Sequence, residues 1–304
     1  MKNKQFIIPS MPGLVESPSD KRDILTSDII PPIQRYPKEC PAPFDLDILH
    51  QGLTPECVSH GGSSLKQYLE KRERSDVIFD EDSAHWLHKK CKEIDNYDGP
   101  GTYLRVMLKV LMKDGLKPKG GTEADAAKYR ISGYAKVDDL SFESLKKHIF
   151  VYGMVLAGFR GSNPGWKTAY IRPPKAGEKT WGHAVDLIAY IIEYLKGQNS
   201  WGPGWGDKGH FYDPESYKPF EAWVVLLDSP NEGIQNTKEG WVALPYVNTA
   251  QTGNRAVVIT PVLNLRDNPN GNLIGKLKQG QKLEIIEKPQ SSGNYTWVKV
   301  RPGI

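Results

Sequence analysis

Residues 199–206 read Asn-Ser-Trp-Gly-Pro-Gly-Trp-Gly, and this stretch carries the most information about the fold. It begins at Asn199, which lies 16 residues after His183. His183 stands at the start of an apolar segment, residues 184–194, whose β-branched and aromatic residues are typical of a strand. Two neighbouring strands joined by a short turn would place His183 beside Asn199. The Asn199 side-chain oxygen would then accept a hydrogen bond from one ring nitrogen and leave the other nitrogen free for proton transfer.

A second segment, residues 51–57, supplies groups that complement this pair. Cys57 directly precedes a predicted helix, whose N-terminal dipole stabilises an anion and lowers the pKa of a thiol. Gln51, six residues earlier, can donate its amide N–H to an oxyanion beside the backbone N–H of Cys57. A cysteine peptidase needs a thiolate, a histidine that moves its proton, a group that orients the histidine, and oxyanion donors. Cys57, His183, Asn199 and Gln51 are the candidates for these four roles.

Together these residues resemble the papain family (C1) of cysteine peptidases. The resemblance rests on Gln51 followed by Gly and, six residues on, by Cys57; on the Gly-His-Ala-Val context of His183; and on residues 199–206. Cys57 precedes His183 by 126 residues and the asparagine by 142, close to the roughly 130–150 residues described for such enzymes. The resemblance spans about residues 44–227.

The resemblance implies an α+β fold: a papain-like two-lobed peptidase domain, helical in one lobe and β-rich in the other, with a peptide-binding cleft between them. It assigns Cys57 as nucleophile, His183 as acid and base, Asn199 as the orienting residue and Gln51 as oxyanion donor. It implies a protein or peptide substrate and no cofactor. Gly99 and Gly101 would form a Gly-rich substrate edge. The pocket for the substrate residue that precedes the scissile residue by one place would be lined by Ala157, Trp181, Gly182 and Ala184. Trp201 would shield the His183–Asn199 hydrogen bond, and Trp205 would line the leaving-group side.

The segment around Cys57 departs from the family pattern. The family usually has Cys-Gly-Ser-Cys-Trp, whereas residues 54–58 read Thr-Pro-Glu-Cys-Val. The partner cysteine is missing, which fits synthesis in a reducing compartment, and Val58 replaces a packing tryptophan. Glu56 places a carboxylate beside the nucleophile and would disfavour the thiolate if it faced the sulfur. We therefore expect Glu56 to point away from Cys57 or to meet a cation.

Neither a metal site nor a disulfide is predicted. His50 and His60 flank the Cys57 segment, but no acid or thiol other than Cys57 stands at ligand spacing. The three cysteines, which include Cys40 and Cys91, do not form an even disulfide framework, and a Cys40–Cys91 bridge is not expected without export.

The start of the chain lacks the pattern of a secretory signal. A basic beginning, residues 1–4, is followed by an apolar run of only Phe6, Ile7 and Ile8, which is too short. No run approaches the ~18 apolar residues that span a bilayer. We expect synthesis in the cytoplasm, with exit by cell lysis or inside a virion.

Composition divides the chain into four parts. Residues 1–39 form an extended arm or a short pro-segment, 40–228 the papain-like domain, 229–254 a linker and 255–304 a small all-β unit. Apolar spacing predicts helices over residues 63–72, 83–92, 102–113 and 141–148, and strands over 150–159, 184–194 and 222–227. Helices first and strands later favour an α+β domain.

The arm contains residues 17–23, Ser-Pro-Ser-Asp-Lys-Arg-Asp. They resemble the Pro-x-Asp-x-Arg-Asp segment that precedes the peptidase domain in many bacterial and viral members. The arm is much shorter than a full inhibitory propeptide. Placement on the domain surface and placement in the cleft both stay open, and a simple wrapping arm is favoured.

Residues 255–304 resemble a bacterial SH3-like (SH3b) domain. The segments that carry this resemblance are 263–269, 274–280, 283–286 and 297–300, whose alternation gives one buried face of a small barrel. Eight Lys or Arg stand against three acids, so this unit carries a net charge of +5 and the first 254 residues about −1. Its candidate partners are peptidoglycan and another protein; no nucleic-acid partner and no membrane span are expected.

Three functions therefore compete. The first is an active cysteine peptidase positioned by its SH3-like domain. The second is a bacteriophage or bacterial hydrolase of cell-wall peptides, which the tail favours, although common wall amidases of the Cys-His type lack the Asn-Ser-Trp-Gly block. The third is a non-catalytic virion or structural component, which the departures around Cys57 favour.

Overall fold

The chain divides into two compact units in the computed structural model. The first contains Met1–Thr26 and Lys38–Val225, and the second Ser27–Pro37 and Leu226–Ile304. The structure describes residues 12–29, 36–73, 75–226, 239–249, 255–258, 262–271, 273–278, 282–293 and 295–302. Within these residues no helix is both long and apolar enough to cross a membrane.

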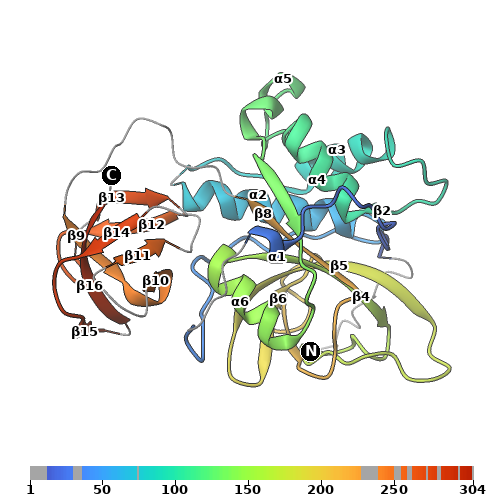
Figure 1. Ribbon diagram of the computed structural model, residues 1–304. Coiled ribbons are helices and arrows are strands. Elements are labelled where there is room, and N and C mark those ends of the chain that lie inside the picture. The colour runs from blue at the N-terminus through green and yellow to red at the C-terminus, as the bar shows by residue number, and fades with distance from the viewer. Residues whose placement is uncertain are drawn as a thin grey trace. The chain divides into compact units, whose positions relative to one another are not determined.

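Three helices form the helical lobe of the first unit (Figure 1). They are α2 (Cys57–Arg72), α3 (Glu81–Lys92) and α4 (Leu104–Lys113). Asp80 caps α3, because its side chain accepts from the Ser83 N–H at 3.2 Å while the Ser83 hydroxyl accepts from the Asp80 N–H. The helices predicted at α3 and α4 are confirmed, and their starts lie two residues earlier and two residues later, respectively, than predicted.

Helix α2 is longer than predicted. The sequence predicts a helix from residue 63, but α2 starts at Cys57 and continues through Gly61 and Gly62. Glycine disfavours a helix by about 1 kcal/mol relative to alanine, so the local pattern misses this turn. The glycines permit close packing, since a Cβ on Gly62 would lie 2.6 Å from the sulfur of Met107. Tertiary packing outweighs the local preference.

The β-rich lobe is a six-stranded sheet in the order β3-β8-β4-β5-β6-β7. At its centre β4 and β5 pair antiparallel from Val155↔Leu187 to Ser162↔Thr180. The mixed fold of helices and sheet agrees with the prediction. The strands are β3 (Gly133–Lys136), β4 (Val155–Ser162), β5 (Thr180–Tyr190), β6 (Tyr194–Gln198), β7 (His210–Pro214) and β8 (Glu221–Leu226).

Helix α6 (Phe142–Tyr152) precedes β4. Ser141 caps it, because the Ser141 side chain accepts from the Ser144 N–H at 3.3 Å. Gly153 ends it with a φ of 78°. The strand predicted over 150–159 is therefore wrong for its first residues, since an apolar run does not by itself distinguish a buried helix from a strand.

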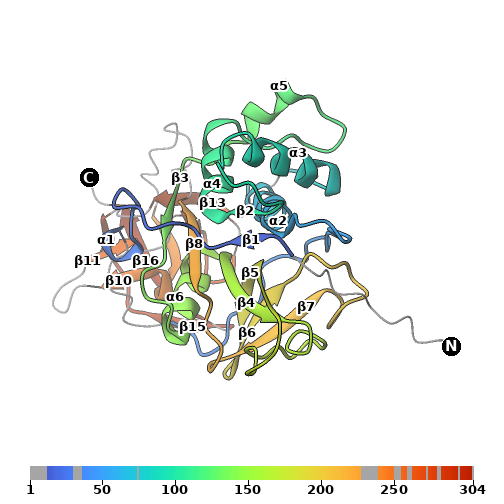
Figure 2. The ribbon, with the colours of Figure 1, turned by 90° about the vertical axis from the view of Figure 1, so that its right-hand side faces the viewer.

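The N-terminal arm crosses the first unit. Strand β1 (Leu14–Val15) pairs in parallel with β2 (Thr102–Tyr103), and Figure 2 shows β1 between the helices and the six-stranded sheet. Further along the arm, Leu25 forms a bridge with Lys136 of β3.

The remaining short helices are α1 (Thr26–Ile29), α5 (Glu123–Ala126), η1 (Ala127–Tyr129) and η2 (Leu244–Tyr246).

The second unit is a sheet in the order β10-β11-β14-β16-β9-β12-β13, with β15 paired to β16. The stretch 229–254, predicted as a linker, contributes β9 and β10, and β9 pairs with both β16 and β12. The reason is burial: Val242 lies in the apolar core, while Trp241 packs in a second cluster with Trp297. The strands are β9 (Gly240–Ala243), β10 (Val247–Thr249), β11 (Arg255–Val258), β12 (Val262–Arg266), β13 (Leu273–Lys278), β14 (Lys282–Ile285), β15 (Gln290–Ser292) and β16 (Tyr295–Pro302).

Candidate active site

The candidate catalytic residues lie on different elements of the first unit. Cys57 is the first residue of α2, His183 lies in β5, and Asn199 directly follows β6. The Asn199 Oδ1 atom lies 2.8 Å from His183 Nε2 and accepts from the backbone N–H of Ser200 at 2.7 Å. The structure therefore brings His183 and Asn199 side by side, as adjacent strands would.

These contacts fix the tautomer of His183. Because the Asn199 oxygen can only accept, His183 Nε2 carries the proton in the neutral ring and Nδ1 is unprotonated. Within the described residues Nδ1 is buried and has no hydrogen-bond partner. The ring stacks on Trp201 at 4.7 Å between centroids and meets Trp166 and Trp181 edge-on at 5.4 and 5.9 Å. His183 is thus oriented and enclosed, with one ring nitrogen ready to accept a proton.

The tryptophan wall around His183 has a second layer. Trp205 packs on Trp201 with ring centroids 5.0 Å apart, and its Nε1–H donates to the Trp166 carbonyl at 3.2 Å. The Trp181 Nε1–H donates to Asn163 Oδ1 at 2.8 Å. Trp166 is fully buried and escapes sequence reasoning, because it follows an Asn-Pro-Gly turn and stands in no motif.

Cys57 is fully buried beside the β5 strand. Its Sγ accepts from the backbone N–H of Ala184, the residue after His183, at 3.4 Å. Burial raises the pKa of the Cys57 thiol to about 12, against the smaller opposing effect of backbone N–H donors. Burial also lowers the pKa of His183 to about 3, although the Asn199 contact acts in the opposite direction. In this closed state both groups are neutral near neutral pH.

Two N–H donors converge on one carbonyl oxygen, that of Pro12. Gln51 Nε2 donates to it at 3.1 Å and the backbone N–H of Cys57 at 3.2 Å. Gln51 is held in place because its Oε1 accepts from the Ser200 hydroxyl at 2.7 Å and its Nε2 also donates to the Thr54 carbonyl at 2.7 Å. The Pro12 oxygen therefore occupies the position in which this pair of donors would hold a substrate oxyanion.

Residues 12–15, called the plug segment below, lie along the predicted substrate edge. A Cβ on Gly101 would come within 2.1 Å of the Gly13 carbonyl oxygen, and a Cβ on Gly182 within 2.3 Å of the Leu14 carbonyl oxygen. Only glycine allows backbones to approach this closely. Gly101 and Gly182, both predicted to bind substrate, thus contact the plug segment.

The Leu14 side chain fills a pocket on the β-rich lobe and is only 6% exposed. A Cβ on Gly158 would lie 2.7 Å from Leu14 Cδ2, so the absence of a side chain at Gly158 makes room for it. Ala157 is the neighbour of Gly158 in β4, and its side chain therefore points to the opposite face of the sheet. Ala184 shares the face of β5 that carries Gly182. The structure places Gly158, rather than the predicted Ala157, at this pocket.

The Gly-rich edge is held by Lys92, which the sequence gives no reason to select from a run of lysines. Its Nζ donates to the carbonyls of Tyr97, Gly99 and Gly101 at 2.7, 2.9 and 3.1 Å and pairs with Asp95 at 2.7 Å. A Cβ on Gly99 would lie 2.3 Å from the Tyr97 ring. Gly99 therefore shapes the edge through its backbone, and Lys92 positions the edge.

Glu56 meets a histidine, not the sulfur of its neighbour Cys57. Its Oε1 lies 3.0 Å from His85 Nδ1, so the carboxylate is engaged away from the sulfur, as one of the two predicted arrangements has it. The Glu56 carbonyl lies 2.9 Å from His60 Nδ1. Among the residues that the structure describes, no His, Cys, Asp and Glu side chains gather as a metal site, and the three cysteines are unpaired.

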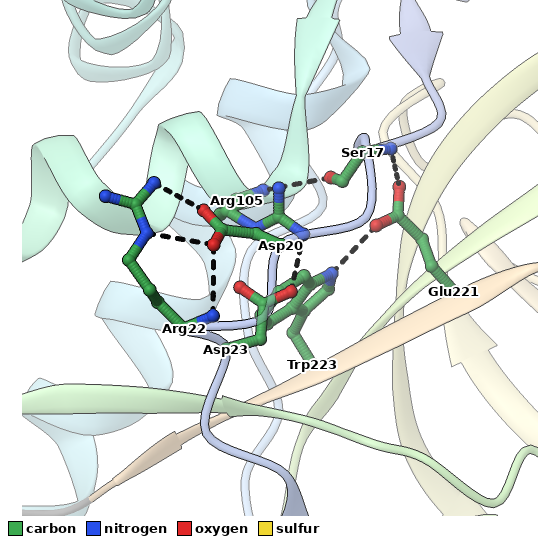
Figure 3. A network of polar contacts seen from close by, with 7 residues as sticks. All are labelled: Ser17, Asp20, Arg22, Asp23, Arg105, Glu221 and Trp223. Atoms are coloured by element: carbon green, nitrogen blue, oxygen red, sulfur yellow. Dashed lines mark hydrogen bonds and ion pairs between the residues drawn. The ribbon is translucent and has the colours of Figure 1, made fainter.

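Residues 17–26, called the anchor segment below, bind both lobes (Figure 3). The Asp23 carboxylate pairs with Arg105 at 2.5 Å, and both side chains are 8% exposed. The Ser17 N–H donates to Glu221 Oε1 at 3.2 Å, and the Ser17 hydroxyl accepts from the Arg105 N–H at 3.4 Å. The simple wrapping arm that the sequence favoured does not describe the plug segment, because its Pro12 carbonyl contacts Gln51 and Cys57 in the cleft.

Residues 88–216 match the sequence model of a family described as papain family cysteine protease. The match includes His183 and Asn199 and begins after Cys57. No curated protein sequence matches the chain.

Several solved structures share the fold of the first unit. Xylellain, a cysteine protease from Xylella fastidiosa, is 20% identical with a TM-score of 0.63, over 71% of this chain and 96% of that chain. A digestive procathepsin L2 proteinase from the larval midgut of Tenebrio molitor is 19% identical with a TM-score of 0.57, over 71% and 78%. Procathepsin B S9 from Trypanosoma congolense is 12% identical with a TM-score of 0.53, over 70% and 85%. The first unit therefore has the papain-like fold, and residues 88–216 within it are similar in sequence to the papain family of cysteine proteases.

Proposed function

We propose that this protein hydrolyses peptide bonds by a Cys-His-Asn mechanism in which Gln51 is an oxyanion donor. The observation that carries the proposal is the convergence of Gln51 Nε2 and the Cys57 N–H on one peptide carbonyl oxygen. Beside it stands a histidine whose Nε2 is occupied by Asn199 and whose Nδ1 has no hydrogen-bond partner among the described residues. A purely structural domain has no need to combine these features.

In the proposed reaction, His183 Nδ1 takes the thiol proton while the Cys57 sulfur bonds to the carbonyl carbon. The carbonyl oxygen becomes negative and is held by Gln51 and the Cys57 N–H. The C–N bond then breaks as His183 gives its proton to the departing amine, which leaves a thioester. His183 next deprotonates a water that attacks the thioester, releasing a carboxylic acid and the thiol.

The resting chain is closed to substrate. The plug segment places the Pro12 carbonyl on the oxyanion donors, and burial holds Cys57 and His183 in their neutral forms. Substrate enters only after the plug segment leaves, which also hydrates the Cys57–His183 pair and favours its charged form.

The proposal is tested in the full-length chain with Gly13→Ala. Gly13 has a φ of 110°, and a Cβ there would lie 1.8 Å from the Pro55 carbonyl oxygen, so the substitution expels the plug segment. We expect Gly13→Ala to cleave a peptide library scored by mass spectrometry, and Gly13→Ala with Cys57→Ala to be inactive. Gly177→Ala is the matched control, because Gly177 has a φ of 82° with nothing within 4 Å of its Cβ position. Cleavage that persists without Cys57 contradicts the mechanism.

For the second unit we propose an SH3-like barrel that positions the peptidase on a binding partner. Antiparallel strands around an apolar core and the basic charge of residues 255–304 support it. Binding to purified cell walls, with released peptides scored by mass spectrometry, tests whether the partner is peptidoglycan and the substrate a wall peptide. Failure to bind leaves a protein partner as the alternative.

A further inference from the structure

Ser17 lies two residues after the plug segment and is hydrogen bonded to both lobes (Figure 3). Its hydroxyl accepts from the N–H of Arg105, in the first turn of α4, at 3.4 Å. Its own N–H donates to Glu221 Oε1, in β8, at 3.2 Å. Ser17 is only 7% exposed. At this point the chain crosses from one wall of the cleft to the other.

Side chains outside the catalytic site hold this crossing in place. The buried Arg105–Asp23 pair is one contact, and the Thr26 hydroxyl donates to Asp138 Oδ1 at 2.9 Å. A buried ion pair is far more costly to break than an exposed one, because the remaining charge is left buried and unpaired. Neither contact involves Cys57, His183 or Gln51. The plug segment can therefore leave the cleft while the anchor segment stays.

The crossing limits how many substrate residues fit in the cleft on the amino-terminal side of the scissile bond. The Pro12 carbonyl marks the oxyanion position, and Leu14 fills the pocket beside Gly158 and Gly182. This is the pocket assigned above to the residue one place before the scissile residue. Ser17 closes the path beyond it. At the spacing of an extended chain, about two or three substrate residues fit between the oxyanion position and the crossing.

We propose that the anchor segment confines this enzyme to releasing short peptides, two or three residues long, from substrates with a free amino terminus. The inference rests on the proposed peptidase activity and names its substrate class. Glu16 supplies a matching charge at the closed end, since its side chain is 58% exposed and its ion pair with Arg160 is 3.6 Å long and exposed. A free α-ammonium group arriving there meets a carboxylate, whereas a longer chain meets Ser17.

The test uses full-length Gly13→Ala and a synthetic decapeptide that carries a Leu-Leu pair at its amino terminus and an identical pair in its interior. One version has a free amino terminus and the other is acetylated. We expect release of a di- or tripeptide from the version with a free amino terminus. In both versions, cleavage after the interior pair should be at least about tenfold slower than this release. Cleavage at the interior pair of the acetylated peptide at an equal rate overturns the inference and leaves the peptidase proposal standing. Cleavage at neither site overturns both.

A second arm loosens the anchor segment. Asp23→Asn removes the charge that pairs with Arg105, and we expect interior cleavage to rise at least about tenfold in the Gly13→Ala background. Asp20→Asn is the matched control, because Asp20 pairs with Arg22 of the arm itself and Arg22 is 85% exposed. Thr26→Val serves as a milder variant should Asp23→Asn fold poorly. Interior cleavage that stays unchanged in a folded loosened variant contradicts the proposal.

Discussion

The plug and anchor segments adjoin in one arm and are held in opposite ways. The plug segment is held by backbone carbonyls, that of Pro12 on the oxyanion donors and that of Gly13 on the Thr102 N–H at 2.9 Å, and by the buried Leu14 side chain. The anchor segment is held through side chains, above all the buried Arg105–Asp23 pair. The plug segment uses groups that a substrate would use, and the anchor segment does not. The arm can thus combine a plug segment that leaves the cleft with an anchor segment that stays bound, only a few residues apart.

Typical interaction energies support the same distinction between the plug segment and the anchor segment. A backbone hydrogen bond contributes about 0.5–1.5 kcal/mol and burial of a leucine such as Leu14 about 1.5–3 kcal/mol, and a substrate can replace both when the plug segment leaves. Removing one partner of a buried ion pair costs about 3–5 kcal/mol, because nothing replaces it. Opening the cleft is therefore inexpensive compared with releasing the anchor segment.

The largest expected effect is that of Arg105→Ala. It leaves the Asp23 carboxylate buried without its cation, so we expect the free energy of unfolding to fall by about 3–5 kcal/mol, measured by chemical denaturation. Arg22→Ala, which removes an exposed arginine from the same network, is the control and should leave stability unchanged. A loss below about 1 kcal/mol for Arg105→Ala would show that the anchor segment is no stronger than the plug segment.

Gly13→Ala should have a smaller effect on stability. The added Cβ drives the plug segment out, which forfeits a few backbone hydrogen bonds and the burial of Leu14 and leaves the anchor segment in place. We expect a fall of about 2–3 kcal/mol in the free energy of unfolding, together with new proteolytic cleavage confined to residues 12–15. A loss as large as that of Arg105→Ala, with cleavage throughout residues 12–26, would show that the two segments move as one.

Thr26→Val probes the far end of the anchor segment. Thr26 is 2% exposed and its hydroxyl donates to Asp138 at 2.9 Å. Loss of this hydrogen bond should lower the free energy of unfolding by about 1 kcal/mol, again by chemical denaturation. An unchanged free energy of unfolding would mean that the Arg105–Asp23 pair alone holds the anchor segment.

Acid should loosen the plug segment selectively. Burial lowers the pKa of His183 from 6.5 to about 3, so the closed state is fully stabilised above pH 6.5 and loses stability as the pH falls toward 3. Hydrogen exchange, corrected for its intrinsic pH dependence, should therefore rise at the amides of residues 13–15 and not at those of 17–26 over this range. His183→Gln, which cannot titrate, should abolish the difference. A parallel rise in both segments would rule out His183 as the cause.

The sequence singles out residues whose chemistry resides in side chains. Gln51, Cys57, His183 and Asn199 stand at informative spacings. The structure pairs His183 with Asn199 and directs the donors of Gln51 and Cys57 to one carbonyl oxygen. Pro12 escapes prediction because it acts through its main-chain carbonyl, which every residue possesses. The same spacing gives no sign that the arm turns through the cleft.

Residues that act through packing are equally hard to predict. Trp166 reaches His183 only because the loop before β5 folds back on the sheet, and Lys92 differs from its neighbouring lysines only in the carbonyls it meets. The first turns of α2 are missed because Gly61 and Gly62 disfavour a helix locally but pack closely in the fold. Long-range contacts decide each case, and they are absent from a local pattern.

The most direct test is the rate at which an epoxide thiol reagent labels Cys57 at neutral pH, located by mass spectrometry. The full-length chain, Gly13→Ala and the control Gly177→Ala are compared, and Cys91, fully buried and outside the site, serves as the internal standard. If the plug segment shields a catalytic thiol, the reagent labels Cys57 at least about tenfold faster in the Gly13→Ala variant than in the other two proteins, and Cys91 stays unlabelled in all three. Equal labelling of Cys57 in all three chains would contradict the account.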